Sequence, residues 1–286
     1  MKKTLLTVGM IIGLAAVACE LAPPDIDTPP VPNVENPSPA ATQPNVTIVG
    51  TVEVEHAEGE QRVTFNLADG SEIVGSFYPP RVSPAPGILL VHQIGMDRLA
   101  WLPMVEVLQG NASRSTGVGQ ETDPNYAVFS FDLPDHGESA GDGSDEAIIA
   151  ATKQALDLFR TMPGVDPDRI VIMGASVGAD AAALLCREGC IGAISVSPGG
   201  YLEIQYTTEL MGMDTRPALC IASKGDVLPY TTCEKGNAAA RGKYQIQIYD
   251  GDYHGNWIIL QNAIIKPDPQ PVPLIMEWLA LNAPLK

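Results

Sequence analysis

Basic residues are scarce in this sequence, which has 17 Lys and Arg against 34 Asp and Glu and a formal net charge of −17. A surface this acidic repels a phosphate backbone, which excludes nucleic-acid binding as a main function. It also disfavours attachment to anionic lipids through basic side chains. The hydrophobic fraction, 45% of 286 residues, excludes a disordered chain and suffices for one large domain or two small ones.

Several motifs that hold cofactors or metals are also absent. The sequence has no glycine-rich phosphate loop of the P-loop or dinucleotide-binding type, so we expect no nucleotide cofactor. It has no C-x-x-C pair, and its four histidines lack a metal-binding spacing, so we expect no metal site.

The N-terminus has the pattern of an export signal. Two lysines precede an uncharged apolar run, 5–18, which is shorter than the roughly 20 residues of a membrane span. Small residues then precede Cys19, in a pattern that resembles the lipobox of bacterial lipoproteins. The resemblance implies a signal peptide over residues 1–18 and a lipid on Cys19 that anchors the protein to a cell membrane. An ordinary secretory leader cut near Ala18 is the alternative, and either one places the folded part outside the cytoplasm.

Residues 19–45 are rich in proline and poor in large apolar side chains. Eight prolines lie between positions 20 and 44, and such a segment cannot bury enough surface to fold. We expect an extended, polyproline-like tether here, with a plain disordered tail or a proline-rich ligand for a partner domain as alternatives. Residues 46–286 then form one folded domain without an internal repeat.

The first part of that domain predicts antiparallel strands. Apolar and polar residues alternate over 46–54 and over 63–67, and Asp69-Gly70 marks a hairpin turn before a third strand at 73–78. We expect these strands at one edge of a sheet.

Beyond these strands, short apolar runs alternate with helical patterns. Such runs are typical of parallel strands that helices bury on both faces. The predicted strands are 87–91, 127–131, 170–173, 193–196, 218–222 and 244–249. The predicted helices are 99–108, 145–160, 177–187 and 273–281. The alternation predicts an α/β fold, with a mostly parallel central sheet, antiparallel N-terminal edge strands and helices on both faces.

Two connections between these elements stand out by their length. The connection 110–125 is long and polar, which predicts a surface loop. The connection 196–218 has room only for a loop at 201–213, so we expect no large cap domain and an open site. This loop contains four residues that could line a pocket, Tyr201, Tyr206, Met211 and Met213. Ordinary packing or surface positions are the alternative for all four.

The sharpest motif follows the strand at 170–173. The chain runs into Gly174-Ala175-Ser176-Val177-Gly178 and then into an alanine-rich helix. A serine in G-x-S-x-G lies on a tight, strained turn between strand and helix, where side chains at the two glycines would collide with neighbouring backbone. The helix N-terminus next to Ser176 can stabilise an oxyanion. The motif therefore predicts a nucleophile at Ser176, with a glycine-rich packing turn as the alternative.

A serine nucleophile needs a base, and the order of the residues along the chain selects the histidine. His254 is the only one of four histidines that follows Ser176, and it lies just past the strand at 244–249. His92 and His136 each follow a strand that precedes the serine. His56 lies in an edge-strand region with no partner in view.

The acid that orients the histidine should lie between the two. Asp226 follows the strand at 218–222, and the order Ser176, Asp226, His254 is the nucleophile, acid and base order expected on this architecture. Asp250 and Asp252 are rivals that immediately precede the histidine, and they more simply shape its loop.

These residues resemble the α/β-hydrolase superfamily, particularly its compact dienelactone-hydrolase-like members, from about residue 73 to the C-terminus. The stretch His92-Gln93-Ile94-Gly95 is similar to the family's oxyanion loop, with Gln93 where glycine is common. The resemblance implies an oxyanion hole formed by the backbone N–H groups of Ile94 and Val177. It also implies that His92 packs or hydrogen-bonds behind this loop.

Two further segments depart from the family pattern. Residues 131–139 are similar to an Asp-x-x-Gly-His-Gly-x-Ser stretch that shapes the pocket wall, with Asp135 in place of a glycine. The resemblance implies that His136 is structural rather than catalytic. Ser223 replaces the glycine of the Gly-x-x-Asp turn that usually carries the acid.

Five cysteines are present, and four remain if Cys19 carries the lipid. Four cysteines allow three pairings. The most local pairing joins Cys186 to Cys190 and Cys220 to Cys233, and a buried free thiol at Cys220 is an alternative.

The leading hypothesis is a serine esterase on the outer face of a membrane, acting on a small-molecule ester through an acyl-enzyme on Ser176. A peptidase or an acyltransferase would use the same three residues. A surface binding protein on a degenerate hydrolase scaffold is the hypothesis from another class, since fold does not fix function.

Overall fold

The computed structural model describes residues 59–111, 125–260 and 269–285, all of which belong to one structural unit of the chain. The predicted signal peptide, Cys19, the tether and the strand at 46–54 lie outside the described residues. So does most of the predicted surface loop at 110–125.

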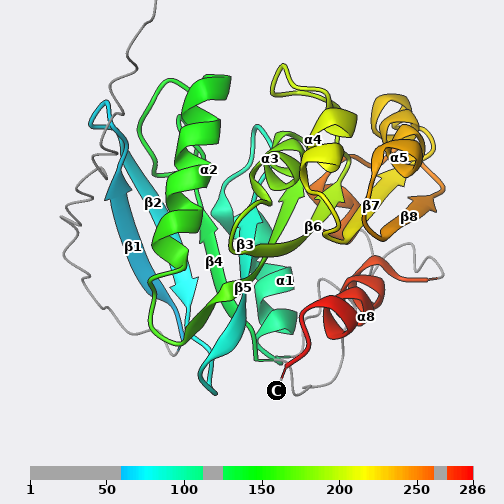
Figure 1. The fold of residues 1–286 in the computed structure, drawn as a ribbon. Helices are drawn as coiled ribbons and strands as arrows, with labels where there is room; N and C mark the ends of the chain where they lie inside the picture. The colour runs from blue at the N-terminus through cyan, green and yellow to red at the C-terminus, as the bar shows by residue number, and fades with distance from the viewer. Residues whose placement is uncertain (1–58, 112–124, 261–268, 286) are drawn as a thin grey trace, which may run out of the picture. The chain divides into compact units, whose positions relative to one another are not determined.

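The described residues form one eight-stranded sheet in the order β1-β2-β4-β3-β5-β6-β7-β8 (Figure 1). Its strands are β1 (Gln61–Asn66), β2 (Glu72–Tyr78), β3 (Ala85–Val91), β4 (Ala127–Phe131), β5 (Val165–Ala175), β6 (Cys190–Val196), β7 (Ala218–Ser223) and β8 (Tyr244–Tyr249). β1 and β2 pair antiparallel at one edge, and the other strands run parallel. The predicted sheet architecture is confirmed.

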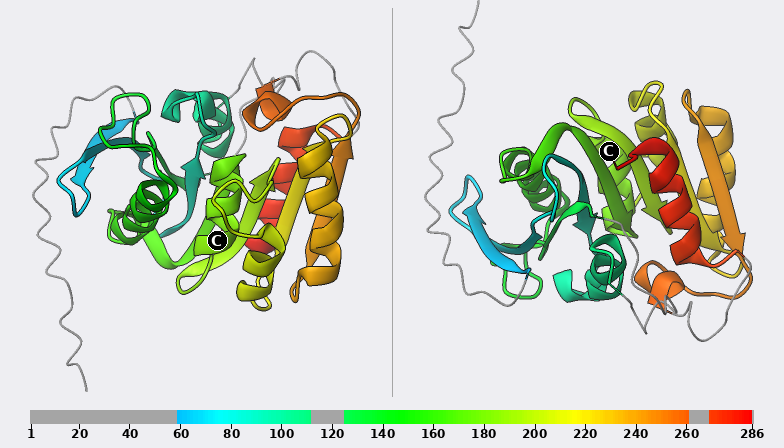
Figure 2. Two further views of the ribbon diagram at one scale, coloured as in Figure 1. Left: turned by 90° about the horizontal axis from the view of Figure 1, so that it is seen from above. Right: turned by 90° about the horizontal axis from the view of Figure 1, so that it is seen from below.

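Helices cover both faces of this sheet (Figure 2). One face carries α2 (Asp145–Phe159), α3 (Val177–Leu185), α4 (Tyr206–Gly212) and α5 (Val227–Ala239). The other face carries the 3-10 helix η1 (Arg98–Trp101), α1 (Leu102–Leu108), α6 (Asn256–Leu260) and α8 (Pro271–Asn282). None of the helices in the described ranges is long and apolar enough to cross a membrane.

The central strands are largely apolar because their side chains enter two cores, one on each face of the sheet. In β3, Leu89 packs into the core beneath α2 to α5, whereas Ile88 and Leu90 pack into the core on the opposite face. Successive side chains of a strand point to opposite faces, so a strand covered on both sides needs apolar residues at every position. This is the physical reason that the uninterrupted apolar runs predicted the parallel strands.

The structure differs from the sequence prediction in its smaller helices. The predicted loop at 201–213 contains the helix α4, which buries only Tyr206 and Leu210. Helix α5 was not predicted, because its few buried residues, Pro229, Cys233 and Gly236, form no apolar stripe. The connection from β6 to β7 still carries no cap domain, since α4 is its one helix.

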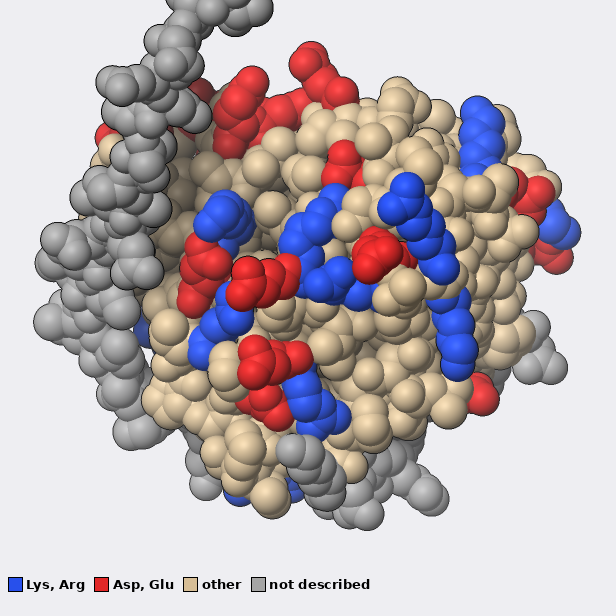
Figure 3. All heavy atoms as spheres, in the orientation of Figure 1, with Lys and Arg blue, Asp and Glu red and all other residues tan. Residues whose placement is uncertain are grey.

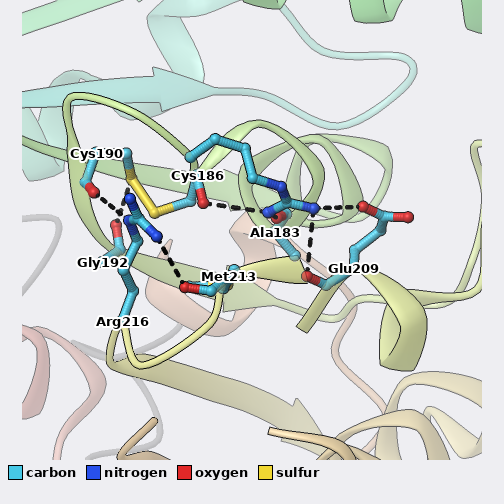
Figure 4. The surroundings of a disulfide bond; sticks show 8 residues. Ala183, Cys186, Cys190, Gly192, Glu209, Met213 and Arg216 are labelled. Carbon is cyan, nitrogen blue, oxygen red and sulfur yellow. Dashed lines mark hydrogen bonds and ion pairs between the residues drawn. A yellow bond between two sulfur atoms is a disulfide. The ribbon is translucent and has the colours of Figure 1, made fainter. Parts of the chain in front are cut away.

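Two disulfides cross-link the second half of the sheet. Cys186 at the end of α3 pairs with Cys190 at the start of β6, and Cys220 in β7 pairs with Cys233 in α5. This is the most local of the three pairings. Near the first disulfide, the guanidinium group of Arg216 donates to the carbonyl oxygens of Cys190 and Met213 (Figure 4).

Charged side chains of both signs mix on the surface that Figure 3 shows. Close ion pairs in the described residues include Lys153–Asp157, at 2.6 Å, and Arg187–Glu209, at 2.7 Å.

Candidate active site

Ser176 lies on a sharp turn between β5 and α3. Its backbone has φ 54° and ψ −119°, in a region that residues with side chains rarely adopt. A Cβ atom at Gly174 would overlap the backbone of Gly178, and one at Gly178 would overlap the carbonyl of Val91 in β3. Both glycines of G-x-S-x-G are therefore required for β5 and α3 to approach so closely.

The structure brings Ser176, Asp226 and His254 together. His254 Nε2 lies 2.8 Å from Ser176 Oγ, and His254 Nδ1 lies 2.6 Å from Asp226 Oδ2. A carboxylate only accepts hydrogen bonds, so Nδ1 carries the proton and Nε2 is free to accept the serine proton. The three side chains come from the ends of β5, β7 and β8, which are parallel strands and so end at the same edge of the sheet.

Neither rival acid forms an ion pair with His254. Asp250 lies in an exposed ion pair with Lys224 at 2.7 Å. The hydrogen bond from the Lys224 ammonium lowers the pKa of the Asp250 carboxyl below its usual value. Among Asp226, Asp250 and Asp252, Asp226 is the carboxylate that hydrogen-bonds to His254.

Backbone hydrogen bonds join the loops that carry Asp226 and His254. Lys224 N–H donates to the Tyr249 carbonyl at 2.9 Å, and Gly225 N–H donates to the Gly251 carbonyl at 2.7 Å. These bonds continue the pairing of β7 with β8 beyond the strand ends. The acid and the histidine therefore approach each other on paired backbone.

The residues that follow His254 are held by two side chains from other strands. Gly255 N–H donates to Ser197 Oγ at 2.9 Å, and Asn256 N–H donates to Gln93 Oε1 at 2.8 Å. Sequence reasoning missed both contacts. The sequence offered one hint for Gln93, which stands where the family pattern usually has glycine. For Ser197 it offered only the position just after β6.

The predicted oxyanion donors lie on adjoining segments. Ile94 lies in the turn after β3, and Val177 is the first residue of α3, where an N–H group has no acceptor within the helix. The first turn of α3 packs against the end of β3, because a Cβ at Gly178 would meet Val91 and His92. The structure therefore places both segments beside Ser176.

His92 holds the loop that follows β3. Its Nδ1–H donates to the Gln93 carbonyl at 2.8 Å, and its Nε2 accepts from Leu133 N–H at 2.9 Å. Burial lowers the pKa of His92 to about 4, so the ring is neutral near pH 7. His136 lies against this ring and hydrogen-bonds the Pro134 carbonyl, away from Ser176.

The segment after β4 is held by a buried carboxylate. Asp132 accepts hydrogen bonds from the backbone N–H groups of Arg98 and Glu138 and from the Arg98 guanidinium. Asp135, which replaces a glycine of the family pattern, has φ 63° in the left-handed region that favours glycine. The aspartate thus adopts the conformation that a glycine would provide.

Tyr201 is the predicted pocket residue that reaches the histidine. Its ring meets that of His254 edge-on, with centroids 5.9 Å apart. Asp180 in α3 holds this segment by accepting from Tyr201 N–H at 2.5 Å and from Gly199 N–H at 3.2 Å. Burial raises the pKa of Asp180 to about 6. Sequence reasoning missed this role of Asp180.

The other three predicted pocket residues have ordinary positions. Tyr206 and Met213 are buried in the core, and Met211 is exposed. These three residues therefore occupy ordinary packing or surface positions, the alternative to lining a pocket. In the described ranges, no group of three or more His, Cys, Asp or Glu side chains is placed to hold a metal ion.

Sequence comparison gives distant relatives. No protein-family model matches the chain. The uncharacterized protein YfhR of Salmonella typhimurium is 27% identical over 235 residues, which cover 69% of this chain and 75% of the relative. YfhR of Escherichia coli K12 is 28% identical over 220 residues, which cover 68% of this chain and 73% of the relative.

Solved structures are similar over most of the described residues. The Pyrococcus furiosus esterase Pf2001 has a TM-score of 0.60 at 16% identity, covering 78% of this chain and 91% of its own. The α/β hydrolase GrgF from Penicillium sp. sh18 has a TM-score of 0.60 at 14% identity, covering 78% and 99%. Acetyl xylan esterase 1 from Thermoanaerobacterium sp. has a TM-score of 0.51 at 18% identity, covering 71% and 81%. Together with the sheet order and the turn at Ser176, these likenesses identify the fold of the chain as the α/β-hydrolase fold.

Proposed function

We propose that the protein is a serine hydrolase that cleaves carboxylic esters through an acyl-enzyme on Ser176. The observation that carries the proposal is the continuous relay from Ser176 Oγ through the His254 ring to the Asp226 carboxylate, with spacings of 2.8 and 2.6 Å. These spacings suit proton transfer from the serine to the imidazole. The structural neighbours named as esterases support hydrolytic chemistry on this scaffold.

In this mechanism His254 takes the proton of Ser176 as the serine oxygen attacks the acyl carbon. Asp226 fixes the imidazole tautomer and stabilises the imidazolium that forms. His254 then protonates the departing alkoxide, which leaves an acyl-serine. Water, deprotonated by the same histidine, attacks the acyl-serine and releases the acid and the free enzyme.

Each tetrahedral intermediate carries a negatively charged oxygen that hydrogen-bond donors must stabilise. The N–H groups of Ile94 and Val177 serve this purpose in the proposed site. Losing one such donor typically lowers kcat by about 10² to 10³-fold. Within the described residues the β6–β7 connection carries only α4, and an open site would match the uncapped dienelactone-hydrolase-like enzymes that the sequence resembles.

Labelling by a fluorophosphonate, together with turnover of p-nitrophenyl esters, tests the proposal. A labelled Ser176 with ester turnover supports an esterase. Peptidase and acyltransferase chemistry would give the same labelling, but faster turnover of peptides or faster transfer to an added alcohol than hydrolysis. A folded protein without labelling or turnover would overturn the proposal in favour of a binding protein on the same scaffold.

The rim of the site favours esters with an apolar acyl chain. Large, exposed apolar side chains lie in the loops and helix starts that follow β3, β7 and β8. They are Ile94, Leu99, Leu102, Val227, Leu228 and Trp257. These segments follow the same strand ends as Ser176, Asp226 and His254, and exposed apolar side chains there would suit an apolar part of the substrate.

We therefore expect kcat/KM to rise from p-nitrophenyl acetate to the hexanoate by roughly fourfold per methylene group that becomes buried. Trp257→Ser should flatten this dependence, because Trp257 follows His254 by one turn. Leu281→Ser, at a more exposed apolar position near the end of α8, should leave it unchanged. A chain-length profile that is already flat in the wild type would contradict the expected preference.

We also propose that residues 1–18 are a signal peptide, that Cys19 is lipidated and that residues 19–45 tether the hydrolase domain, 46–286, to a membrane outside the cytoplasm. The two disulfides support an oxidising location.

In a bacterium that processes lipoproteins, we expect the full chain in the membrane fraction and the Cys19→Ser variant in the soluble fraction, since a chain without its lipids loses its anchor. Mass spectrometry of the N-terminal peptide should show an acylated cysteine. A free Cys19 thiol on a soluble wild-type protein would instead indicate an ordinary secretory leader.

A further inference from the structure

The side chain of Gln93 bridges two parts of the candidate active site that are far apart in sequence. It extends from the end of β3 and is only 9% exposed. Its Oε1 accepts the N–H of Asn256, 163 residues later, at 2.8 Å. Asn256 is the first residue of α6 and follows His254 by two positions.

The backbone of Gln93 is fixed as well. Its carbonyl accepts from His92 Nδ1–H at 2.8 Å and from Met96 N–H at 3.2 Å. The second bond closes a four-residue turn in which Gly95 has φ 79°, the value that a type II turn requires at its third residue. Ile94, the proposed oxyanion donor, is the second residue of this turn.

The fit around the amide oxygen of Gln93 is close. A Cβ at Gly255 would overlap Gln93 Oε1, so a glycine is needed between His254 and Asn256. Gly255 N–H donates to Ser197 Oγ on the other side. The chain after His254 is therefore held at two consecutive N–H groups.

We propose that Gln93 is a positioning residue that sets the oxyanion-binding turn and the base His254 at a fixed separation. The inference rests on the proposed function. One residue then holds both groups that must act together on the tetrahedral intermediate: its backbone presents the N–H of Ile94, and its side chain anchors the loop of His254. A glycine, which the related pattern has at this position, offers no such anchor.

The consequence should appear in kcat. The serine proton moves to His254 while negative charge develops at the oxyanion, so a displacement between the two acts on the transition state. A misplacement of about 1 Å can cost about 10²-fold in rate. Substrate binding at the rim does not depend on this separation, so KM should change little.

The test compares Gln93→Met, which keeps the length and removes the acceptor, with Gln93→Glu, which keeps an acceptor oxygen. We expect kcat to fall about 10²-fold in Gln93→Met and to recover substantially in Gln93→Glu. The control Gln109→Ala removes a hydrogen bond from another glutamine to the Tyr126 carbonyl, and should leave kcat unchanged.

Gln93→Glu also moves the pH profile. A new carboxylate beside the His254 segment stabilises the imidazolium, so the acid limb of kcat/KM should shift to higher pH. Asp226 and Tyr201 already contact the ring, and burial raises the pKa of Tyr201 to about 12. Such a shift would show that the side chain at position 93 lies close enough to His254 to act on its charge.

Hydrogen exchange over residues 254–257 tests the anchor without any activity. It should speed up in Gln93→Met and stay slow in Gln93→Glu. Unchanged exchange in Gln93→Met would overturn the anchor, and a kcat within threefold of the wild type would overturn its catalytic importance. If the wild-type protein neither turned over esters nor reacted with a fluorophosphonate, the proposed function on which the inference rests would be wrong.

Discussion

Ser176→Ala is expected to lower kcat for p-nitrophenyl butyrate by about 10⁶-fold while leaving the fold intact. The hydroxyl is the atom that forms the acyl-enzyme, and no other group in the relay can replace it. Removing one oxygen from the turn between β5 and α3 leaves its backbone contacts in place, including the bond from the residue's N–H to the Val196 carbonyl at 2.8 Å. The variant should therefore keep the wild-type circular dichroism spectrum and thermal midpoint.

Ser195→Ala is the matched control for this experiment. Ser195 is a buried serine in β6, and its hydroxyl donates to the Ala179 carbonyl in α3 at 3.1 Å. Its loss should cost about 1 kcal/mol of stability and little activity. A folded Ser176→Ala variant that keeps more than a hundredth of the wild-type kcat would rule out an acyl-enzyme at this serine.

The second large effect is expected for Asp226→Asn, which should lower kcat by about 10⁴-fold. An amide in place of the carboxylate can donate to Nδ1 of His254, which favours the tautomer with its proton on Nε2. That tautomer cannot accept the proton of Ser176. The loss should be clearest in the rate of acylation, measured by the burst of p-nitrophenol or by fluorophosphonate labelling.

Asp250→Asn separates the two candidate acids. Its carboxylate faces Lys224 on the surface, and solvent-exposed pairs of this kind contribute little to stability. We expect wild-type kcat in this variant. If Asp250→Asn rather than Asp226→Asn abolished turnover, the assignment of the acid from the strand order and from the 2.6 Å contact would be wrong.

The fold could be predicted from the sequence wherever burial alone decides the residue types. Strand β4, Ala127–Phe131, is buried throughout and has the predicted bounds. Strand β8, Tyr244–Tyr249, also has the predicted bounds, although it is only partly buried. Helix α5 escaped prediction because it packs through only a few small or polar side chains. Strand β5 begins at Val165, five residues before its predicted start at 170. The prediction missed this part because residues 166–169 are mostly polar and not fully buried.

The sequence predicts those residues of the candidate site that a local turn motif or the order along the chain identifies. Ser176 was marked by two glycines within its own turn, and His254 and Asp226 by their order after it. Gln93 and Asp180 were not predicted, because each acts on a segment that only the folded chain brings near. Contacts of this kind leave no spacing pattern in a single sequence.

The two disulfides brace the elements that carry Ser176 and Asp226, but not the segment that carries His254. The bond between Cys220 and Cys233 closes a ring of chain that contains Asp226, and the bond between Cys186 and Cys190 secures the far end of the helix that begins after the serine. No cysteine follows Cys233 in the sequence, so the segment that carries the histidine has no covalent cross-link.

In the proposed cycle, this distribution matches what each residue has to do. His254 exchanges its proton in turn with the serine oxygen, the leaving group and water, and hydrogen bonds to Gln93 and Ser197 hold the residues that follow it. Disulfides brace the elements that carry the nucleophile and the acid. Reducing agents should therefore loosen the segment that carries Asp226 first. The hydrogen bonds that hold the segment after His254 should be affected only indirectly.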